Sequence, residues 1–348
     1  MSPRPAAFLL TFASLLLACD SPLAADEPPA FELIVLEGRD AETLRGGAIG
    51  DSGLVCVRTR DNLILLWRPG SEATPIDPTA LQRSNYEPAA IGPNDTVALT
   101  ARPFMVDGQS CLGFLVKPDR TMAFAPLRSP PPSGDTAFAR LYGVRFDGNG
   151  RVLATASNGR GGSTQRAIAY SPGGGLRPVD RSLPKDATDE LAGLLDGDPI
   201  LTRRSRAGVS IVRVAGEVGK PLDVAVPDQP NAEIKYAAGA GGGFVIVQVF
   251  IPGNNRTTLM RWSPDGTADL WENHPDRVLG VADDGSVIAT SSLSSPRLWL
   301  TDGSQHTLSN LVDGDVRVHS GLATNARGDV LTVIKHPDGE RYAVFRRK

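Results

Sequence analysis

The chain's repeating unit is clearest in Gly46-Gly47-Ala48-Ile49-Gly50-Asp51-Ser52-Gly53-Leu54-Val55-Cys56-Val57, which continues through Leu63-Ile64-Leu65-Leu66-Trp67-Arg68-Pro69-Gly70 to Thr74-Pro75-Ile76-Asp77. Short apolar runs separated by Asp-Ser-Gly and Pro-Gly turns are typical of antiparallel strands and hairpins. The unit therefore predicts a small sheet of four strands.

The same pattern returns six more times along the chain. When the units are aligned on the turn residue before the second strand, that residue is Gly53, Asp95, Gly150, Asp198, Gly243, Gly285 and Gly328. By subtraction, the intervals are 42, 55, 48, 45, 42 and 43 residues. A period of roughly 40–50 residues with four strands per period is typical of a β-propeller. The sequence predicts an all-β protein, a single seven-bladed β-propeller of four-stranded blades.

A column of large side chains supports this alignment. Near the end of the third strand, the units carry Trp67, Val116, Tyr170, Arg213, Trp262, Trp299 and Phe345. Five aromatic residues in one column, in a chain that is only 6% aromatic, indicate a shared structural position. We expect these side chains to fill the space between neighbouring blades. Arg213 makes the fourth unit the least certain in its alignment.

The last unit lacks one strand, and the N-terminal end of the chain has one strand to spare. The seventh unit reaches Lys348 after three strands, and residues 31–37 form a spare strand before the first unit. The N-terminal strand is therefore predicted to close the ring, because closure removes exposed sheet edges. The propeller is expected to span residues 31–348.

The first residues predict export and a lipid anchor. A basic Arg4 precedes an apolar run from Ala6 to Leu17, which is typical of a secretory signal. Leu16-Leu17-Ala18-Cys19 resembles the lipobox of bacterial lipoproteins, so residues 1–18 are interpreted as a lipoprotein signal peptide, Cys19 as the lipidated residue and residues 19–30 as a tether. Ordinary cleavage near Ala25 is the alternative. The expected location is the bacterial cell envelope, facing the periplasm or the cell exterior.

Two further cysteines, Cys56 and Cys111, belong to neighbouring units. Export permits a disulfide between them, and two buried thiols are the alternative.

Motifs for common chemistries are missing from the sequence. The chain has no nucleophile-elbow, phosphate-loop or zinc-protease motif, and its four histidines fall at unrelated points of the repeat. Asp147-Gly148-Asn149-Gly150 begins like a calcium loop, but Asn158 stands where the acidic twelfth ligand belongs. We expect no metal, no cofactor and no nucleic-acid partner, and a monomeric protein.

One polar column is predicted to surround the mouth of the axial channel. It lies eight residues before the turn column and contains Arg45, Glu87, Tyr142, Glu190, Lys235, Arg277 and Ser320. His319 is adjacent to it. Such a ring suits a site for a small ligand or a glycan, although solvent exposure alone also favours polar residues.

The hairpins between second and third strands are rich in arginine. They carry Arg58, Arg60, Arg102, Arg160, Arg166, Arg203, Arg204, Arg206, Arg256, Arg297, Lys335 and Arg341 against Asp61, Asp107, Asp338 and Glu340. Because these hairpins open on one face, the count predicts a positive face that binds an anionic partner, centred on Arg203, Arg204 and Arg206. The alternative is that these arginines only keep the hairpin tips soluble.

Three units carry a family resemblance. Residues 48–55, 281–288 and 323–330 resemble the G-[IL]-N-x-x-G-x-V units of exported bacterial proteins, and they are most similar to HAF-type propeller repeats. The His-Ala-Phe triplet is replaced by Tyr342-Ala343-Val344 and Ala167-Ile168-Ala169. The resemblance implies a surface or periplasmic propeller of undefined activity.

Two functions fit these observations. The first is a non-catalytic binding or scaffolding propeller, tethered to a bacterial membrane, for an anionic glycan, lipid headgroup or protein segment. The second is a glycan lyase or hydrolase that uses Glu87, Tyr142, Glu190 and His319 at the channel mouth, because paired carboxyl groups can perform acid–base work on a sugar.

Overall fold

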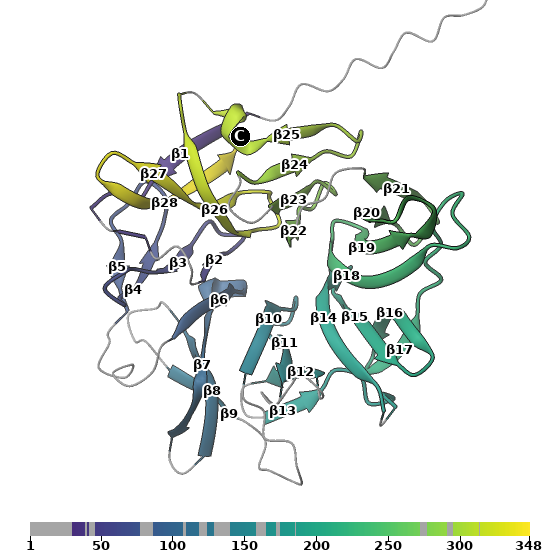
Figure 1. Cartoon of the computed structure of the whole chain (residues 1–348). Helices are drawn as coiled ribbons and strands as arrows, with labels where there is room; N and C mark the ends of the chain where they lie inside the picture. Colours follow the sequence, from purple (N-terminus) through teal and green to yellow (C-terminus); the bar gives the residue numbers. More distant parts are fainter. Residues whose placement is uncertain are drawn as a thin grey trace, which may run out of the picture.

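The computed structural model describes residues 30–38, 40–41, 46–76, 86–106, 109–117, 124–128, 140–157, 165–171, 175–184, 186–271, 277–290, 295–312 and 314–348. These residues form seven antiparallel sheets of four strands, arranged as blades around a central opening (Figure 1). The predicted all-β, seven-bladed propeller is confirmed. In this part of the chain the helical content is limited to three 3-10 turns, η2 (Pro93–Asp95), η3 (Pro252–Asn254) and η4 (Leu308–Leu311).

The first four blades follow one another along the chain, and each runs outward from the central opening. Blade 1 contains β2 (Gly47–Ile49), β3 (Val55–Arg58), β4 (Ile64–Trp67) and β5 (Thr74–Pro75). Blade 2 contains β6 (Glu87–Ile91), β7 (Val97–Val106), β8 (Gln109–Val116) and β9 (Phe124–Arg128). Blade 3 contains β10 (Arg140–Phe146), β11 (Val152–Ser157), β12 (Gln165–Ser171) and β13 (Gly175–Pro178). Blade 4 contains β14 (Thr188–Leu195), β15 (Asp198–Ser205), β16 (Gly208–Ala215) and β17 (Val218–Pro221).

The last three blades complete the ring. Blade 5 contains β18 (Glu233–Gly241), β19 (Phe244–Ile251), β20 (Arg256–Trp262) and β21 (Ala268–Trp271). Blade 6 contains β22 (Arg277–Val281), β23 (Val287–Thr290), β24 (Arg297–Trp299) and β25 (Gln305–Thr307). Blade 7 contains β26 (Arg317–Thr324), β27 (Val330–His336), β28 (Gly339–Arg347) and, on its outside, β1 (Phe31–Val35).

The N-terminal strand closes the ring as the sequence predicts. β1 pairs antiparallel with β28, so that Phe31 lies opposite Arg347 and Val35 opposite Ala343. Blade 7 is also joined to blade 1 by hydrogen bonds. Asn325 Nδ2 donates to the carbonyl of Gly50 at 3.0 Å, and the backbone N–H of Ala326 donates to Asp51 Oδ1 at 2.8 Å.

The hydrophobic core lies between blades rather than at the centre of the ring. One cluster, for example, joins Trp67 and Val57 of blade 1 to Tyr342 and Val344 of blade 7. The residues of the aligned column are buried, as expected, in the blades that carry Trp67, Val116, Tyr170, Trp262, Trp299 and Phe345. Each of them lies opposite a valine at the start of the second strand.

In blade 4 the structure shows that the sequence alignment was one residue off. Arg213 is not the column residue: it pairs with Ile200 and forms an ion pair with Asp198, with 2.8 Å between Nε and Oδ2. Val214, which is buried, takes the place that aromatic residues occupy elsewhere. The matching turn residue is Gly197, whose φ of +84° agrees with +82° at Gly53 and +80° at Gly285. A left-handed turn position of this kind favours glycine.

The two cysteines of the propeller are both buried, and they are not joined to each other. The possible disulfide between Cys56 and Cys111 is therefore absent, and the alternative of two buried thiols holds. Burial raises the pKa of the Cys56 thiol well above its usual range. Cys19 and the segment 1–29 lie outside the described residues, and within those residues no helix is long and apolar enough to cross a membrane.

Candidate functional site: the axial channel

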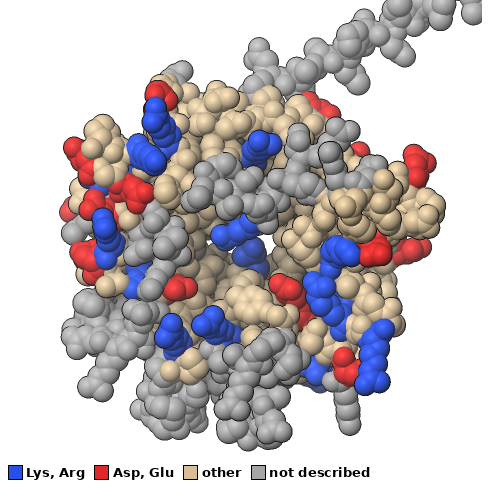
Figure 2. Space-filling model, viewed as in Figure 1, with Lys and Arg blue, Asp and Glu red and all other residues tan. Residues whose placement is uncertain are grey.

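The first strands of all seven blades surround a cavity along the axis of the ring. Its volume is about 1450 Å³, and its wall includes residues of β2, β6, β10, β14, β18, β22 and β26. In the space-filling view the ring is hollowed at its centre, and basic side chains lie beside the opening (Figure 2). Drug-sized ligands occupy pockets of roughly 300–1,000 Å³, so the cavity can hold a ligand of that size.

The structure brings most of the predicted polar column together in this cavity. Its lining includes Glu87, Tyr142, Glu190, Arg277 and Ser320, from blades 2, 3, 4, 6 and 7. Arg45 lies outside the described residues.

Lys235 is the wrong residue of blade 5 for this column. The lining residue is its neighbour Tyr236, which lies opposite Gln248, as Glu190 lies opposite Thr202. Lys235 instead forms an ion pair with Glu233, at 2.6 Å, and its ammonium lies 5.0 Å from the centre of the Phe250 ring.

The displacement has a simple cause in the length of one turn. Between the paired residues Ala240 and Val245, blade 5 has four residues, 241–244, whereas blade 3 has five, 147–151, between Phe146 and Val152. Counting back a fixed number of residues from the turn therefore gives a position one residue too early. Blade 4 has an equally short turn, which by itself would place the predicted channel residue one position too early. The sequence alignment also took Asp198 as its turn residue, one position after the true one, Gly197. The two errors have opposite directions, so the predicted residue, Glu190, is the correct one.

Hydrogen bonds between blades fix the mouth residues in place. Thr155 Oγ1 of blade 3 accepts from the backbone N–H of Leu191 at 2.8 Å, and Thr202 Oγ1 of blade 4 accepts from that of Ala237 at 2.8 Å. Leu191 and Ala237 directly follow Glu190 and Tyr236 in the sequence. The second-strand threonine of one blade thus anchors the channel residue of the next.

Glu190 affects the tyrosines on both sides of it. Burial and the negative charge of Glu190 raise the pKa of Tyr142 to about 12. Burial and the same carboxylate also raise the pKa of Tyr236, with Arg204 acting in the opposite direction. Both phenols therefore stay protonated at neutral pH. They can donate hydrogen bonds but are poor bases.

Two hydroxyl groups in the channel are buried and have no hydrogen-bond partner among the described residues. They are Tyr142 Oη on blade 3 and Ser320 Oγ on blade 7. Buried polar groups are normally paired, so each needs a water molecule or a ligand atom. Both oxygens are covered by the residues around them, so side chains of the channel wall must shift before a bound molecule can reach them.

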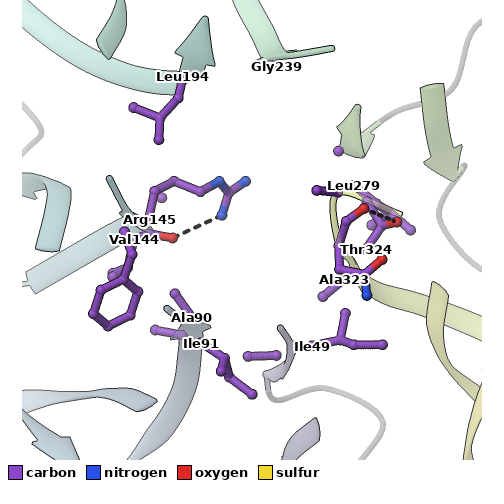
Figure 3. Close-up of a pocket in the computed structure, with 18 of the residues that line it drawn as sticks. Ile49, Ala90, Ile91, Val144, Arg145, Leu194, Gly239, Leu279, Ala323 and Thr324 are labelled. Carbon is purple, nitrogen blue, oxygen red and sulfur yellow. Dashed lines mark hydrogen bonds between the residues drawn. The ribbon is translucent and has the colours of Figure 1, made fainter. Parts of the chain in front are cut away.

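Arg145, like Tyr236, is a channel residue that the sequence analysis missed. It lies opposite Leu153, two residues along β11 from Thr155, the partner of Tyr142, and its side chain extends from the wall into the open channel (Figure 3). The guanidinium Nη1 donates to the carbonyl of Val144 at 3.0 Å. The residues at this level in the other blades are all alanine or glycine, namely Ala48, Ala90, Gly193, Gly239, Gly280 and Ala323.

The arginines of the hairpin face are less available than the sequence count indicates. The side chain of Arg203 is only 12% exposed, and it forms ion pairs with Asp180 and Asp189, the latter with 2.9 Å between Nε and Oδ1. Arg58 and Arg341 are also buried, and Arg341 forms an ion pair with Asp40. Acidic residues from the links between blades, which the hairpin count left out, neutralise part of this face.

Arg204 and Arg206 remain exposed on that face, and the latter lies 3.8 Å from Asp186. His319 lies outside the cavity lining, with its Nδ1 3.3 Å from Glu340 Oε1. In the view of Figure 2, acidic and basic side chains lie near one another at the left and right sides of the ring.

Comparisons with known proteins agree on the fold alone. No family model and no curated protein matches the chain. Among solved structures, it is similar to YCF48 bound to D1 peptide, with a TM-score of 0.54, 11% identity, and coverage of 93% of this chain and 99% of that one. It is also similar to the WD40 β-propeller domain of Doa1, with a TM-score of 0.51, 13% identity, and coverage of 92% and 98%. These likenesses establish a β-propeller, and the resemblance to HAF-type repeats stays a prediction.

Proposed function

We propose that this chain is a non-catalytic binding protein of the bacterial cell envelope, anchored by a lipid on Cys19, and that it binds a small polar ligand in the axial channel. A β-propeller is a scaffold that suits binding in general. The observation that carries the more specific proposal is the cavity of about 1450 Å³ with a polar layer contributed by different blades.

The chemistry of the channel wall supports a ligand with several polar groups. Glu87 and Glu190 offer acceptors, Arg277 offers donors, and the hydroxyls of Tyr142 and Ser320 have no partner among the described residues. Because these side chains come from blades all around the ring, one ligand could contact several of them at once. Such convergent polar groups in a concave site are what fixes the orientation of a small molecule.

A plug in the channel tests this proposal. Glu87 is exposed at the channel mouth, so Glu87→Trp should fill the opening without disturbing the core. We expect the full chain, purified in mild detergent and incubated with envelope extract, to retain a small molecule detectable by native mass spectrometry. Glu87→Trp should lose it, and the control Lys220→Trp, on the outer strand β17, should keep it. Equal retention by Glu87→Trp and wild type would exclude the channel as the site.

A second candidate, a glycan-active enzyme, has one specific observation in its favour. Glu190 lies close enough to Tyr142 to raise the pKa of its hydroxyl, and Glu87 lines the same cavity. His319, the other residue predicted for such an enzyme, does not line the cavity. Glu190→Gln separates the candidates. An enzyme would lose turnover of the retained glycan while still binding it, whereas a binding protein would release the glycan unchanged in both forms.

A further inference from the structure

Two arginine side chains line the channel from opposite sides of the ring. Arg145 belongs to blade 3 and Arg277 to blade 6, and Figure 1 shows β10 and β22 facing each other across the opening. Both side chains are exposed to the channel. In the described part of the chain, neither forms an ion pair with a carboxylate, in contrast to Arg203 and Arg341.

The hydrogen bonds that these two guanidinium groups do make leave most of their donors unused. Arg145 Nη1 donates to the Val144 carbonyl at 3.0 Å, and Arg277 Nη2 reaches the Leu322 carbonyl at 3.5 Å. A guanidinium has five N–H donors in a planar fork that matches the oxygens of a carboxylate or a phosphate. Each side chain therefore still has donors to offer to a ligand.

The positive charge of Arg277 acts on Arg145 across the channel. The pKa of Arg145 is lowered, first by burial of the guanidinium within the channel and second by the charge of Arg277. Burial likewise lowers the pKa of Arg277. A bound anion that contacts both guanidinium groups would offset the effect of one positive charge on the other.

The neighbouring backbone leaves room for such an anion. At the level of Arg145 the other first strands carry only alanine and glycine, and a Cβ on Gly280 would lie 2.5 Å from Thr324 Cγ2. These small residues let adjacent first strands approach closely. They also leave Arg145 as the one long side chain at this depth, so its guanidinium extends into open space.

We infer that Arg145 and Arg277 form an oxyanion site inside the channel, which binds the carboxylate or phosphate of a small hydroxylated ligand. This inference rests on the proposed function, because it assumes that the channel is the binding site. The carboxylates of Glu87 and Glu190 then contact the uncharged part of the ligand, and the hydroxyls of Tyr142 and Ser320 contact it once the side chains that cover them shift. The inference therefore places the binding site for an anionic partner in the channel, whereas the sequence analysis expected it on the hairpin face.

Inorganic phosphate is the simplest probe of this site. Titration calorimetry of the full chain at low ionic strength should give millimolar binding that weakens as chloride is added, because the contact is between charges. Arg145→Gln and Arg277→Gln should each lower the affinity about tenfold, since each removes one charge-assisted contact. Arg297→Gln, at the one exposed residue of β24 in blade 6, should bind like wild type.

The melting temperature of the variants separates a binding role from a structural one. If the arginines serve a ligand, Arg145→Gln and Arg277→Gln should melt at or above the wild-type temperature without phosphate, and phosphate should raise the melting temperature of the wild type and of Arg297→Gln more than that of either variant. Destabilised variants, or phosphate binding that is absent or equal in all four proteins, would overturn the inference. Comparison of D-glucuronate, glucose 6-phosphate and glucose then distinguishes a carboxylate ligand from a phosphate ligand.

The inference and the proposed function can fail separately. If phosphate does not bind at these arginines but Glu87→Trp still abolishes retention of an envelope ligand, the oxyanion site is wrong and the channel remains the binding site. If phosphate binds as expected but Glu87→Trp retains the envelope ligand, the proposed function is wrong and the oxyanion site stands.

Discussion

Individual arginines in this propeller have different roles that depend on their surroundings. Arg203 lies between two buried carboxylates, whereas Arg145 extends into the channel with no ion pair among the described residues. The ion pairs of Arg203 join blade 4 to the link that precedes it. The arrangement of Arg145 leaves a charge available for a ligand.

Arg203 should therefore matter for stability. Arg203→Gln removes the partner of Asp180 and Asp189, and breaking a buried pair from one side costs about 3–5 kcal/mol. We expect a clearly lower midpoint in urea, whereas Arg206→Gln, whose side chain is 92% exposed, should stay within about 0.5 kcal/mol of wild type.

The stabilising effect of Arg203 should also depend on pH. Burial pushes the pKa of Asp180 upward, but hydrogen bonds from Ser182 and Arg203 outweigh it, and the pKa is lowered overall. A carboxyl group with a lowered folded-state pKa stabilises the fold above its unfolded value of about 3.9 and loses that contribution as the pH falls further. The stability difference between wild type and Arg203→Gln should shrink below about pH 4. A difference that is constant from pH 7 to pH 3 would contradict this account.

The channel residues show what could be predicted from sequence at this scale. Glu87, Tyr142, Arg277 and Ser320 follow directly from the repeat, because their blades have turns of equal length. Arg145 also had a visible signal, since it interrupts a column of alanine and glycine. The pairing of Arg203 with Asp180 had none, because it depends on how the link before blade 4 folds against β15.

At the level of strands, contacts between blades are what position the site. Thr155 and Thr202 accept hydrogen bonds from the first strand of the following blade, next to Glu190 and Tyr236. The seven-unit period and the closing strand were predictable from turn spacing and apolar runs. The short turns of blades 4 and 5 were not, because one-residue differences lie within the natural variation of the repeat.

Thr202→Val tests whether this hydrogen bond holds the blades together. The substitution keeps the shape but leaves the buried N–H of Ala237 without its acceptor, which costs about 1–3 kcal/mol. We expect a lower melting temperature and weaker ligand binding at Tyr236. Thr74→Val, on the exposed outer strand of blade 1, is the control, and equal behaviour of the two variants would show that the hydrogen bond is unimportant.

Closure by β1 gives a second prediction for strands. Phe31 is buried against the core shared by blades 6 and 7, and β1 covers the edge of β28. Deletion of residues 31–35 should cost about 3–6 kcal/mol through lost apolar burial and should expose a strand edge. Thermal unfolding and light scattering would measure this effect. A truncated protein that melts like wild type and stays monomeric would disprove the role of β1 in closure.

For the whole molecule, we propose a membrane anchor joined to a ring that binds its ligand at the centre. The anchor predicted at Cys19 leaves residues 20–30 as a link to β1, which begins at Phe31. Cys19→Ser should release the protein from the membrane fraction or leave its precursor unprocessed. Mass spectrometry that finds a wild-type mature start near Asp26 would rule out the lipid anchor.

The most direct test of the central claim is a crystal structure of the protein with the molecule that it retains from envelope extract. The account predicts ligand density within the axial channel, with an anionic group against Arg145 and Arg277 and polar contacts to Tyr142 or Ser320. Density on the hairpin face instead, against Arg204 and Arg206, with an empty channel, would contradict it.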